Sequence, residues 1–417
     1  MKKLWLLVGL AVLALAISAP YAAAQGKVLK VGVQGPFTGP IALTGQEFKV
    51  SAEMAMENIG YKIGDYKIEI VWIDDQCDPA KATAAFSEAI DKQGVDVAVM
   101  NFCSSVGIAV MDVVADAKVP HMFGGAATEL MNQKYRSNPE RYAYASIKGW
   151  PVPATLMQGY LGALEEAIAK GTWKPAKKTF AIFGEDTDWG RSCGGALKDL
   201  FAQNGWEIIS EDYFPFTQTD YYSLLNRWRS QNVALIGGTL QHPGIAAMIK
   251  QAQEVGLKSM IIADGMGWVG NWFELIGPST DKVLDMIPQL VTPEAKAWAA
   301  KFEARTGGKP SPSAGGLAYD GTNLLIKVLN RTLEKHGKID SESIKEVIVS
   351  ELHTGKLTFT RAEGAILMNA YVYTPETIPD PVVGPEGYFF PVLQYDDSGT
   401  GHIIYPPFVA TTDFRAP

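Results

Sequence analysis

The 417-residue sequence has little of what several functional classes need. Acidic residues outnumber basic ones by 45 to 37, giving a formal net charge of −8, whereas nucleic-acid-binding domains usually carry a basic excess. There is no GxxxxGK[ST] phosphate-binding loop and no HExxH motif, so nothing indicates a P-loop ATPase or a zinc protease. Histidine is scarce, with five residues, and His242 has no second His or Cys at metal-ligand spacing. We therefore expect neither a nucleic-acid partner nor a metal site.

Long hydrophobic runs are also absent beyond the N-terminus. Residues 4–17 form an apolar run behind Lys2 and Lys3, and three alanines end at Ala24. This layout is typical of a secretory signal peptide, because the run is too short to span a bilayer. We predict a signal peptide at residues 1–24, cleavage after Ala24, and a soluble mature protein exported to the periplasm.

The remaining sequence has the composition of a globular protein, with 47% hydrophobic and 20% charged residues, and its length suggests two or three domains. Val- and Ile-rich stretches alternate with amphipathic ones, as in parallel sheets that helices cover on both faces. The predicted strands are 28–35, 67–74, 95–102, 119–124, 179–184, 233–237 and 259–263. The predicted helices are 46–58, 79–92 (capped by Asp78), 106–117, 190–203, 243–255, 292–305 and 313–336.

Two such sets of elements predict an α/β protein with two doubly wound, Rossmann-like lobes. The late helices at 292–305 and 313–336 have no strands of their own, so we expect them to return to the first lobe. The aromatic stretch 357–417 is expected to form β-hairpins on the second lobe. Lobe 1 is therefore predicted as residues 25–146 plus 287–355, and lobe 2 as 147–286 plus 356–417. Three hinge crossovers are predicted near Ile147, Met286 and Lys356.

Ligands in open α/β sheets bind beyond the carboxyl ends of the strands. Ser104 and Ser105 follow a strand of lobe 1 at the start of a helix, where hydroxyl and N–H groups suit a carboxylate, although either serine can simply cap the helix. Ala126, Ala127 and Thr128 follow the next strand. Their small side chains let a ligand approach the backbone, and the alternative is an ordinary tight turn.

Three further candidates follow strands of lobe 2. Trp189 can lie over a cation or an aromatic ring. Thr239 offers a hydroxyl, and His242 is expected to be a polar rim residue. Asp264 can hold a cation, or it can cap the glycine-rich turn that follows it.

That turn, residues 265–270, matches the dinucleotide fingerprint GxGxxG, and Asp285 lies near the position of a ribose-binding acid. The motif follows the last strand of its lobe rather than the first, and an exported protein is not expected to meet nicotinamide cofactors. We therefore predict no cofactor.

Four motifs spread over the chain together resemble the type I periplasmic solute-binding proteins of ABC transporters, in the branched-chain amino-acid branch. They are residues 32–40 (GVQGPFTGP), 74–79 (DDQCDP), 103–105 (CSS) and 318–320 (AYD). The resemblance implies two lobes that close on a ligand. It also implies a disulfide between Cys77 and Cys103, which leaves Cys193 as a free, buried cysteine in a predicted helix.

The resemblance further implies roles for the candidate residues. Ser104 and Thr128 correspond to residues that hold a ligand carboxylate, with backbone contacts from Ala126. Asp264 stands where an acid, more usually Glu, holds the ligand ammonium, and Trp189 stands where Tyr is common. Thr44 and Thr239 stand where aromatic residues are frequent, so a ligand larger than leucine, isoleucine or valine, or differently shaped, fits better.

We predict a monomeric binding protein, not an enzyme, that captures a small polar ligand and delivers it to the membrane permease of an ABC transporter. The ligand is expected to be an amino acid or a related carboxylate or amide. The alternatives are an enzyme that uses the same cleft, with Asp264 as a base, and a ligand-sensing receptor domain. Turnover of a bound ligand would distinguish the enzyme from the binding protein.

Overall fold

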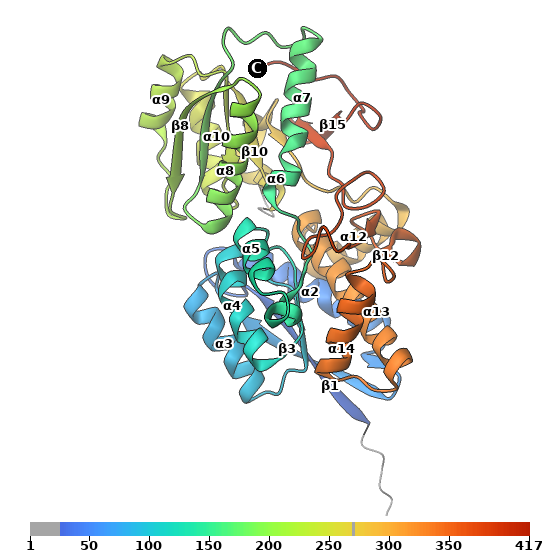
Figure 1. Cartoon of the computed structure of the whole chain (residues 1–417). Coiled ribbons are helices and arrows are strands. Elements are labelled where there is room, and N and C mark those ends of the chain that lie inside the picture. Colours follow the sequence, from blue (N-terminus) through green and yellow to red (C-terminus); the bar gives the residue numbers. More distant parts are fainter. Residues whose placement is uncertain (1–25, 269–271) are drawn as a thin grey trace, which may run out of the picture.

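The computed structural model describes residues 26–268 and 272–417, so the predicted signal peptide lies outside it. Figure 1 shows two α/β lobes, one above the other, with the chain passing between them more than once. Within the described residues, no helix is long and apolar enough to cross a membrane.

The first lobe is built on a six-stranded sheet in the order β2-β3-β1-β4-β5-β6, parallel except at the β2–β3 edge. Its strands are β1 (Lys27–Gly35), β2 (Lys62–Ile63), β3 (Tyr66–Asp74), β4 (Val97–Val99), β5 (His121–Phe123) and β6 (Ile147–Lys148). The intervening helices are α2 (Ala42–Asn58), α3 (Pro79–Asp91), α4 (Ser104–Ala117) and α5 (Glu129–Ser137).

Three late helices return to this lobe, whereas the sequence predicts only the first two of them. They are α12 (Pro293–Thr306), α13 (Leu317–His336) and α14 (Ser341–Val347). Helix α13 contacts α2, β2 and β4, and Trp298 of α12 packs in one apolar cluster with Met54 of α2. Figure 1 shows α13 and α14 in orange beside the blue elements from the start of the chain.

The second lobe has a seven-stranded sheet in the order β15-β14-β11-β10-β9-β7-β8, parallel from β11 to β8. Its strands are β7 (Thr179–Glu185), β8 (Glu207–Phe214), β9 (Leu235–Thr239), β10 (Met260–Asp264), β11 (Leu284–Asp285), β14 (Val392–Tyr395) and β15 (Gly401–Tyr405). Its helices are α6 (Pro153–Leu156), α7 (Gln158–Ala169), α8 (Asp188–Gln203), α9 (Tyr222–Ser230), α10 (Gly244–Glu254) and α11 (Trp272–Ile276). The two mostly parallel sheets confirm the predicted fold class.

Local signals account for some element boundaries and not for others. Helix α3 starts as predicted, because the Asp78 side chain accepts the N–H groups of Ala80 and Lys81. Strands β4 and β5 are shorter than the apolar runs that predict them. Val95 and Phe102 belong to those runs and are buried, yet they lie outside the paired strand, so hydrophobicity marks burial better than it marks pairing.

The C-terminal stretch is divided between the two lobes, whereas its aromatic pattern predicts that all of it lies on the second lobe. β14 and β15 extend the second sheet, but β12 (Phe359–Thr360) and β13 (Ala370–Tyr371) form a separate hairpin. The Asp320 carboxylate on α13 accepts the N–H groups of Ile366 and Leu367 at 2.8 and 2.9 Å and the Tyr371 hydroxyl at 2.9 Å. A buried acid of the first lobe therefore holds this segment.

The predicted disulfide is confirmed. Cys77 and Cys103 are bonded, with their Cα atoms 5.5 Å apart, and Cys193 is a free, buried cysteine on α8. The bond ties the loop after β3 to the start of α4, so it fixes two of the segments that leave the carboxyl edge of the first sheet.

Candidate ligand-binding site

A cavity lies between the lobes, where the carboxyl ends of both sheets face each other. The first lobe contributes residues that follow β1, β3, β4, β5 and β6, and the second lobe contributes the end of β7 and residues that follow β7, β8 and β9. This is the position that ligands occupy in open α/β sheets. The strand-end rule applied to the sequence therefore points to the correct region of each lobe.

Aromatic side chains from both lobes line this cavity. Phe102 and Trp150 come from the first lobe and the segment leaving it, and Trp189 and Phe216 from the second. Trp189 is buried, and its indole N–H donates to the Thr239 hydroxyl at 3.3 Å. Thr239 is not among the lining residues, so it supports Trp189 from behind.

The start of α4 forms the polar wall of the first lobe. Ser104 and Ser105 line the cavity. The Ser104 hydroxyl oxygen also accepts the N–H groups of Ala127 and Thr128, at 3.2 and 3.3 Å. Thr128 in turn caps α5, because its side-chain oxygen accepts the N–H of Leu130 at 3.3 Å. Ser104 thus connects the two helix N-termini, and Ala126, Ala127 and Thr128 are buried without lining the cavity.

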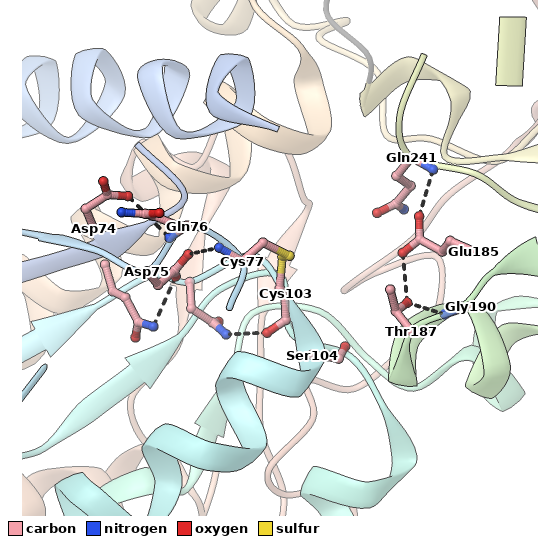
Figure 2. The surroundings of a disulfide bond; sticks show 12 residues. Asp74, Asp75, Gln76, Cys77, Cys103, Ser104, Glu185, Thr187, Gly190 and Gln241 are labelled. Carbon is pink, nitrogen blue, oxygen red and sulfur yellow. Dashed lines mark hydrogen bonds between the residues drawn. A yellow bond between two sulfur atoms is a disulfide. The ribbon is translucent and has the colours of Figure 1, made fainter. Parts of the chain in front are cut away.

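The second lobe presents a buried carboxyl group, that of Glu185 at the end of β7. One carboxyl oxygen accepts the Thr187 hydroxyl at 3.0 Å, and the other accepts the N–H of Gln241 at 3.0 Å. Burial raises the pKa of Glu185 to about 7, and these two hydrogen bonds act in the opposite direction. Figure 2 shows Glu185, Thr187 and Gln241 across from Cys103 and Ser104.

Asp264 lies elsewhere, beneath the surface of the second lobe. It is buried and accepts the Tyr160 hydroxyl at 2.8 Å, and it is not among the residues that line the cavity. Burial, followed by the nearby charge of Asp285, raises the pKa of Asp264 to about 8.

The glycine-rich turn after Asp264 is capped by another acid. The Asp285 carboxylate accepts the N–H groups of Gly265 and Gly267 at 2.8 and 3.2 Å. The suggestion that Asp264 caps this turn is therefore wrong. The acid that the dinucleotide fingerprint would assign to a ribose is instead hydrogen-bonded to the fingerprint's own backbone, and the third glycine lies outside the described residues.

Of the predicted site residues, the structure brings Ser104, Ser105 and Trp189 to the cavity, and Ala126, Ala127, Thr128, Thr239 and Asp264 lie outside its lining. Glu185 and Gln241 were missed as candidates. The strand-end rule contains the signal for Glu185, because this residue directly follows the predicted strand 179–184.

A serine motif at the start of α8 also resembles an enzyme signature. Residues 190–194 read Gly-Arg-Ser-Cys-Gly and match the GxSxG pattern of α/β-hydrolases. In those enzymes the serine sits on the sharp turn between a strand and a helix. Here Ser192 lies inside α8, and its hydroxyl oxygen accepts the N–H of Glu129 from the first lobe at 3.4 Å. The match therefore lacks the nucleophile-elbow geometry.

The lobes also contact each other away from the cavity. The Ser311 hydroxyl, held beside the first lobe, donates to the Gly267 carbonyl of the second lobe at 2.9 Å. The Glu47 carboxylate on α2 accepts the N–H groups of Ser311 and Gly315 at 2.9 and 3.0 Å. The two lobes are therefore in direct hydrogen-bond contact through residues that do not line the cavity.

Comparison with known proteins agrees with this architecture. The family model for periplasmic binding proteins matches residues 28–375. The chain belongs to the periplasmic binding protein family. Its two α/β lobes with a cavity between them are those of the type I branch, as the sequence motifs imply.

Relatives of this periplasmic binding protein include a Leu/Ile/Val-binding protein homologue of Brucella suis, 28% identical over 359 residues, with 84% of this chain and 85% of the relative covered. The leucine-, isoleucine-, valine-, threonine- and alanine-binding protein of Pseudomonas aeruginosa is 24% identical, covering 84% of this chain and 90% of the relative. Among solved structures, an ABC transporter solute-binding protein from R. palustris in complex with 4-hydroxybenzoate has a TM-score of 0.72 at 22% identity, covering 94% of this chain and 98% of that one.

Proposed function

We propose that this protein is an extracytoplasmic solute-binding protein that captures a small polar ligand between its lobes and delivers it to the permease of an ABC transporter. One observation carries the proposal: the carboxyl ends of both sheets meet at a cavity with aromatic walls and polar ends, in a chain of the periplasmic binding protein family. A binding protein of this kind needs hinge closure and no chemical step.

The proposal includes export through residues 1–24 to the periplasm and action as a monomer. It keeps the lobe boundaries predicted from the sequence, 25–146 plus 287–355 and 147–286 plus 356–417, except that it assigns β6 and the β12–β13 hairpin to lobe 1. Three passages of the chain support a hinge: from β6 to β7, from β11 to α12, and from α14 to β14. The β12–β13 hairpin would move with lobe 1, since Asp320 of α13 holds it.

For the ligand, two classes follow from the relatives: amino acids with small or branched side chains, and aromatic carboxylates. Ser104 and Ser105, at the N-terminus of α4, suit the carboxylate that both classes carry. Trp189 and the other aromatic walls suit a flat or apolar body. Ala126, Ala127, Thr128 and Thr239 would act from behind these contacts.

Mass spectrometry of small molecules released by denaturing the purified protein tests this proposal. A thermal-shift panel of amino acids, benzoates and amides then identifies the class, because a ligand at a thousand times its Kd adds about 4 kcal/mol to stability. If no small molecule is released and no member of the panel raises the melting temperature, the proposed function is wrong.

The same ligand also tests the enzymatic alternative. The ligand that raises the melting temperature is incubated with the protein, and its amount is followed by chromatography. A binding protein leaves the amount of ligand unchanged, however long the two are incubated together. Protein-dependent loss of the ligand would favour an enzyme instead.

A further inference from the structure

Among its described lining residues, the cavity between the lobes has one ionisable side chain, which is acidic. Among the described residues that line it, Glu185 is the only one with a titratable side chain, because Cys77 and Cys103 are joined in the disulfide. Glu185 is buried, and its hydrogen-bond donors are neutral groups, the Thr187 hydroxyl and the Gln241 N–H. No Lys, Arg or His belongs to the described lining, so no protein cation there faces this carboxyl group.

A buried carboxylate without a cation is costly, because two neutral hydrogen bonds replace only part of its hydration. A ligand with a positively charged nitrogen would supply the missing charge when the lobes close. The opposite wall has the opposite preference: the first-turn N–H groups of α4, with Ser104 and Ser105, favour an anion. The two walls together match a ligand with a carboxylate at one end and an ammonium at the other.

We propose that Glu185, and not Asp264, is the residue of the second lobe that receives the ligand's positively charged nitrogen. This inference rests on the proposed function and names the polarity of its ligand: a zwitterion that bridges the lobes, with its carboxylate at α4 and its ammonium at Glu185.

Asp264 is poorly placed for the same task. It lies outside the cavity lining, and the Tyr160 hydroxyl already donates to it. Glu185 reaches the cavity because it is the last residue of β7, which lies between β9 and the edge strand β8 and ends at the cavity. The neutral donors also leave Glu185 close to its titration point at neutral pH, since burial raises its pKa to about 7.

The groups that hydrogen-bond to Glu185 have no charge that changes near neutral pH. Thr187 and Gln241 do not titrate. Cys193 on α8 faces it, but burial together with the charges of Asp264 and Glu185 raises the pKa of this thiol well above its usual value, so the thiol stays neutral. Affinity for a cationic nitrogen should therefore fall as the pH drops below about 7, whereas affinity for an uncharged or purely anionic ligand should not.

The test compares three proteins and two ligands. The proteins are wild type, Glu185→Gln and the matched control Asp264→Asn, which alters another buried carboxyl group at a strand end of the second lobe. The ligands are the proteinogenic L-amino acid that raises the melting temperature most and its analogue that lacks only the amino group. Isothermal titration gives each Kd, and circular dichroism and melting of the empty proteins show that both variants fold.

We expect Glu185→Gln to weaken the amino acid roughly tenfold or more through loss of a charge-assisted hydrogen bond, and to leave the des-amino analogue within about threefold. Asp264→Asn should leave both within about threefold, and Glu185→Asp, tested if Glu185→Gln does not fold, should keep part of the preference for the amino acid. Equal losses for both ligands in Glu185→Gln, or a larger selective loss in Asp264→Asn, would overturn the proposal.

Failure of this inference is distinguishable from failure of the proposed function. If 4-hydroxybenzoate or another ligand without a cationic nitrogen binds and no amino acid does, Glu185 does not receive an ammonium, although the protein is still a solute-binding protein. If neither the amino acids nor any other small molecule binds, both are wrong.

Discussion

Replacing Asp264 by Asn should stabilise the empty protein, and increasingly so as the pH rises. The Asp264 carboxyl group is buried, with a pKa of about 8 in the folded protein against a reference value of 3.8. Below about pH 4 the group is protonated in both the folded and the unfolded chain and contributes no difference. Between about pH 4 and pH 8 the unfolded chain releases its proton while the folded chain retains it. The free energy of unfolding therefore falls as the pH rises, and it levels off above about pH 8.

The size of the effect follows from the two pKa values. At pH 7 the gap to the reference value of 3.8 is about three pH units. At about 1.4 kcal/mol per unit, Asp264 destabilises the folded protein at pH 7 by on the order of 4 kcal/mol. Asn removes the titration and keeps a side-chain oxygen that accepts the Tyr160 hydroxyl. The new amide N–H groups of Asn need buried acceptors, which offsets part of the gain. We therefore expect the free energy of unfolding to rise by about 1–3 kcal/mol.

Urea unfolding of the ligand-free proteins at pH 5 and pH 8 measures this. The difference in unfolding free energy, Asp264→Asn minus wild type, should grow by about 2–4 kcal/mol between the two pH values. Other raised carboxyl groups, such as Glu47 and Asp320, titrate in both proteins and cancel in this difference. Parallel pH profiles would refute the reasoning, because they would mean that Asp264 is ionised in the folded protein at neutral pH.

Three further predictions concern the frame of the site. Reducing the Cys77–Cys103 bond, which spans a sequence separation of 26, should lower the free energy of unfolding by about 3–4 kcal/mol, measured by urea unfolding with and without dithiothreitol; an unchanged midpoint would contradict this. Ser104→Ala should lower the unfolding free energy of the empty protein by about 1–3 kcal/mol, since two buried N–H groups lose their acceptor, and should also weaken the binding of carboxylate ligands. A loss of affinity at constant melting temperature would show that the serine contacts only the ligand. Lys148→Met should lower the unfolding free energy by about 3–5 kcal/mol, because it leaves Asp380 buried without the cation 2.9 Å away. A Lys148→Met/Asp380→Leu double variant should regain part of this stability, measured by thermal melting. No regain would mean that the cost lies in packing.

The fold could be predicted from the sequence because its signals are local and repeated. Parallel strands buried on both faces are apolar along their whole length, and Asp78 with Pro79 marks a helix start by side-chain capping alone. The lengths of β4 and β5 could not be predicted, because burial continues beyond the paired residues into loops that the other lobe and the late helices cover.

The division of the C-terminal stretch was missed for a different reason. The hairpin β12–β13 is held by the Asp320 carboxylate, which accepts two backbone N–H groups and the Tyr371 hydroxyl. Asp320 lies about forty-six residues earlier on a helix, and nothing in the local pattern of either segment records the pairing. A buried acid on a helix is a signal that a distant backbone needs an acceptor, but the sequence does not say which backbone.

The site depends on an order of strands that the sequence does not contain. Glu185 and Asp264 each end a parallel strand, so the strand-end rule makes both acids candidates for contact with the ligand. In the sheet, β7 lies between β8 and β9, and lining residues lie at or just after the ends of all three strands. β10 lies on the far side of β9, and none of the described residues after it line the cavity. The same order brings Asp285 of β11 beside the turn after β10, where it takes the N–H groups that a ligand would otherwise meet. The strand order β10-β9-β7-β8 changes direction at β7, and ligands in such sheets bind where this happens. Which acid faces the ligand therefore depends on how the whole sheet assembles.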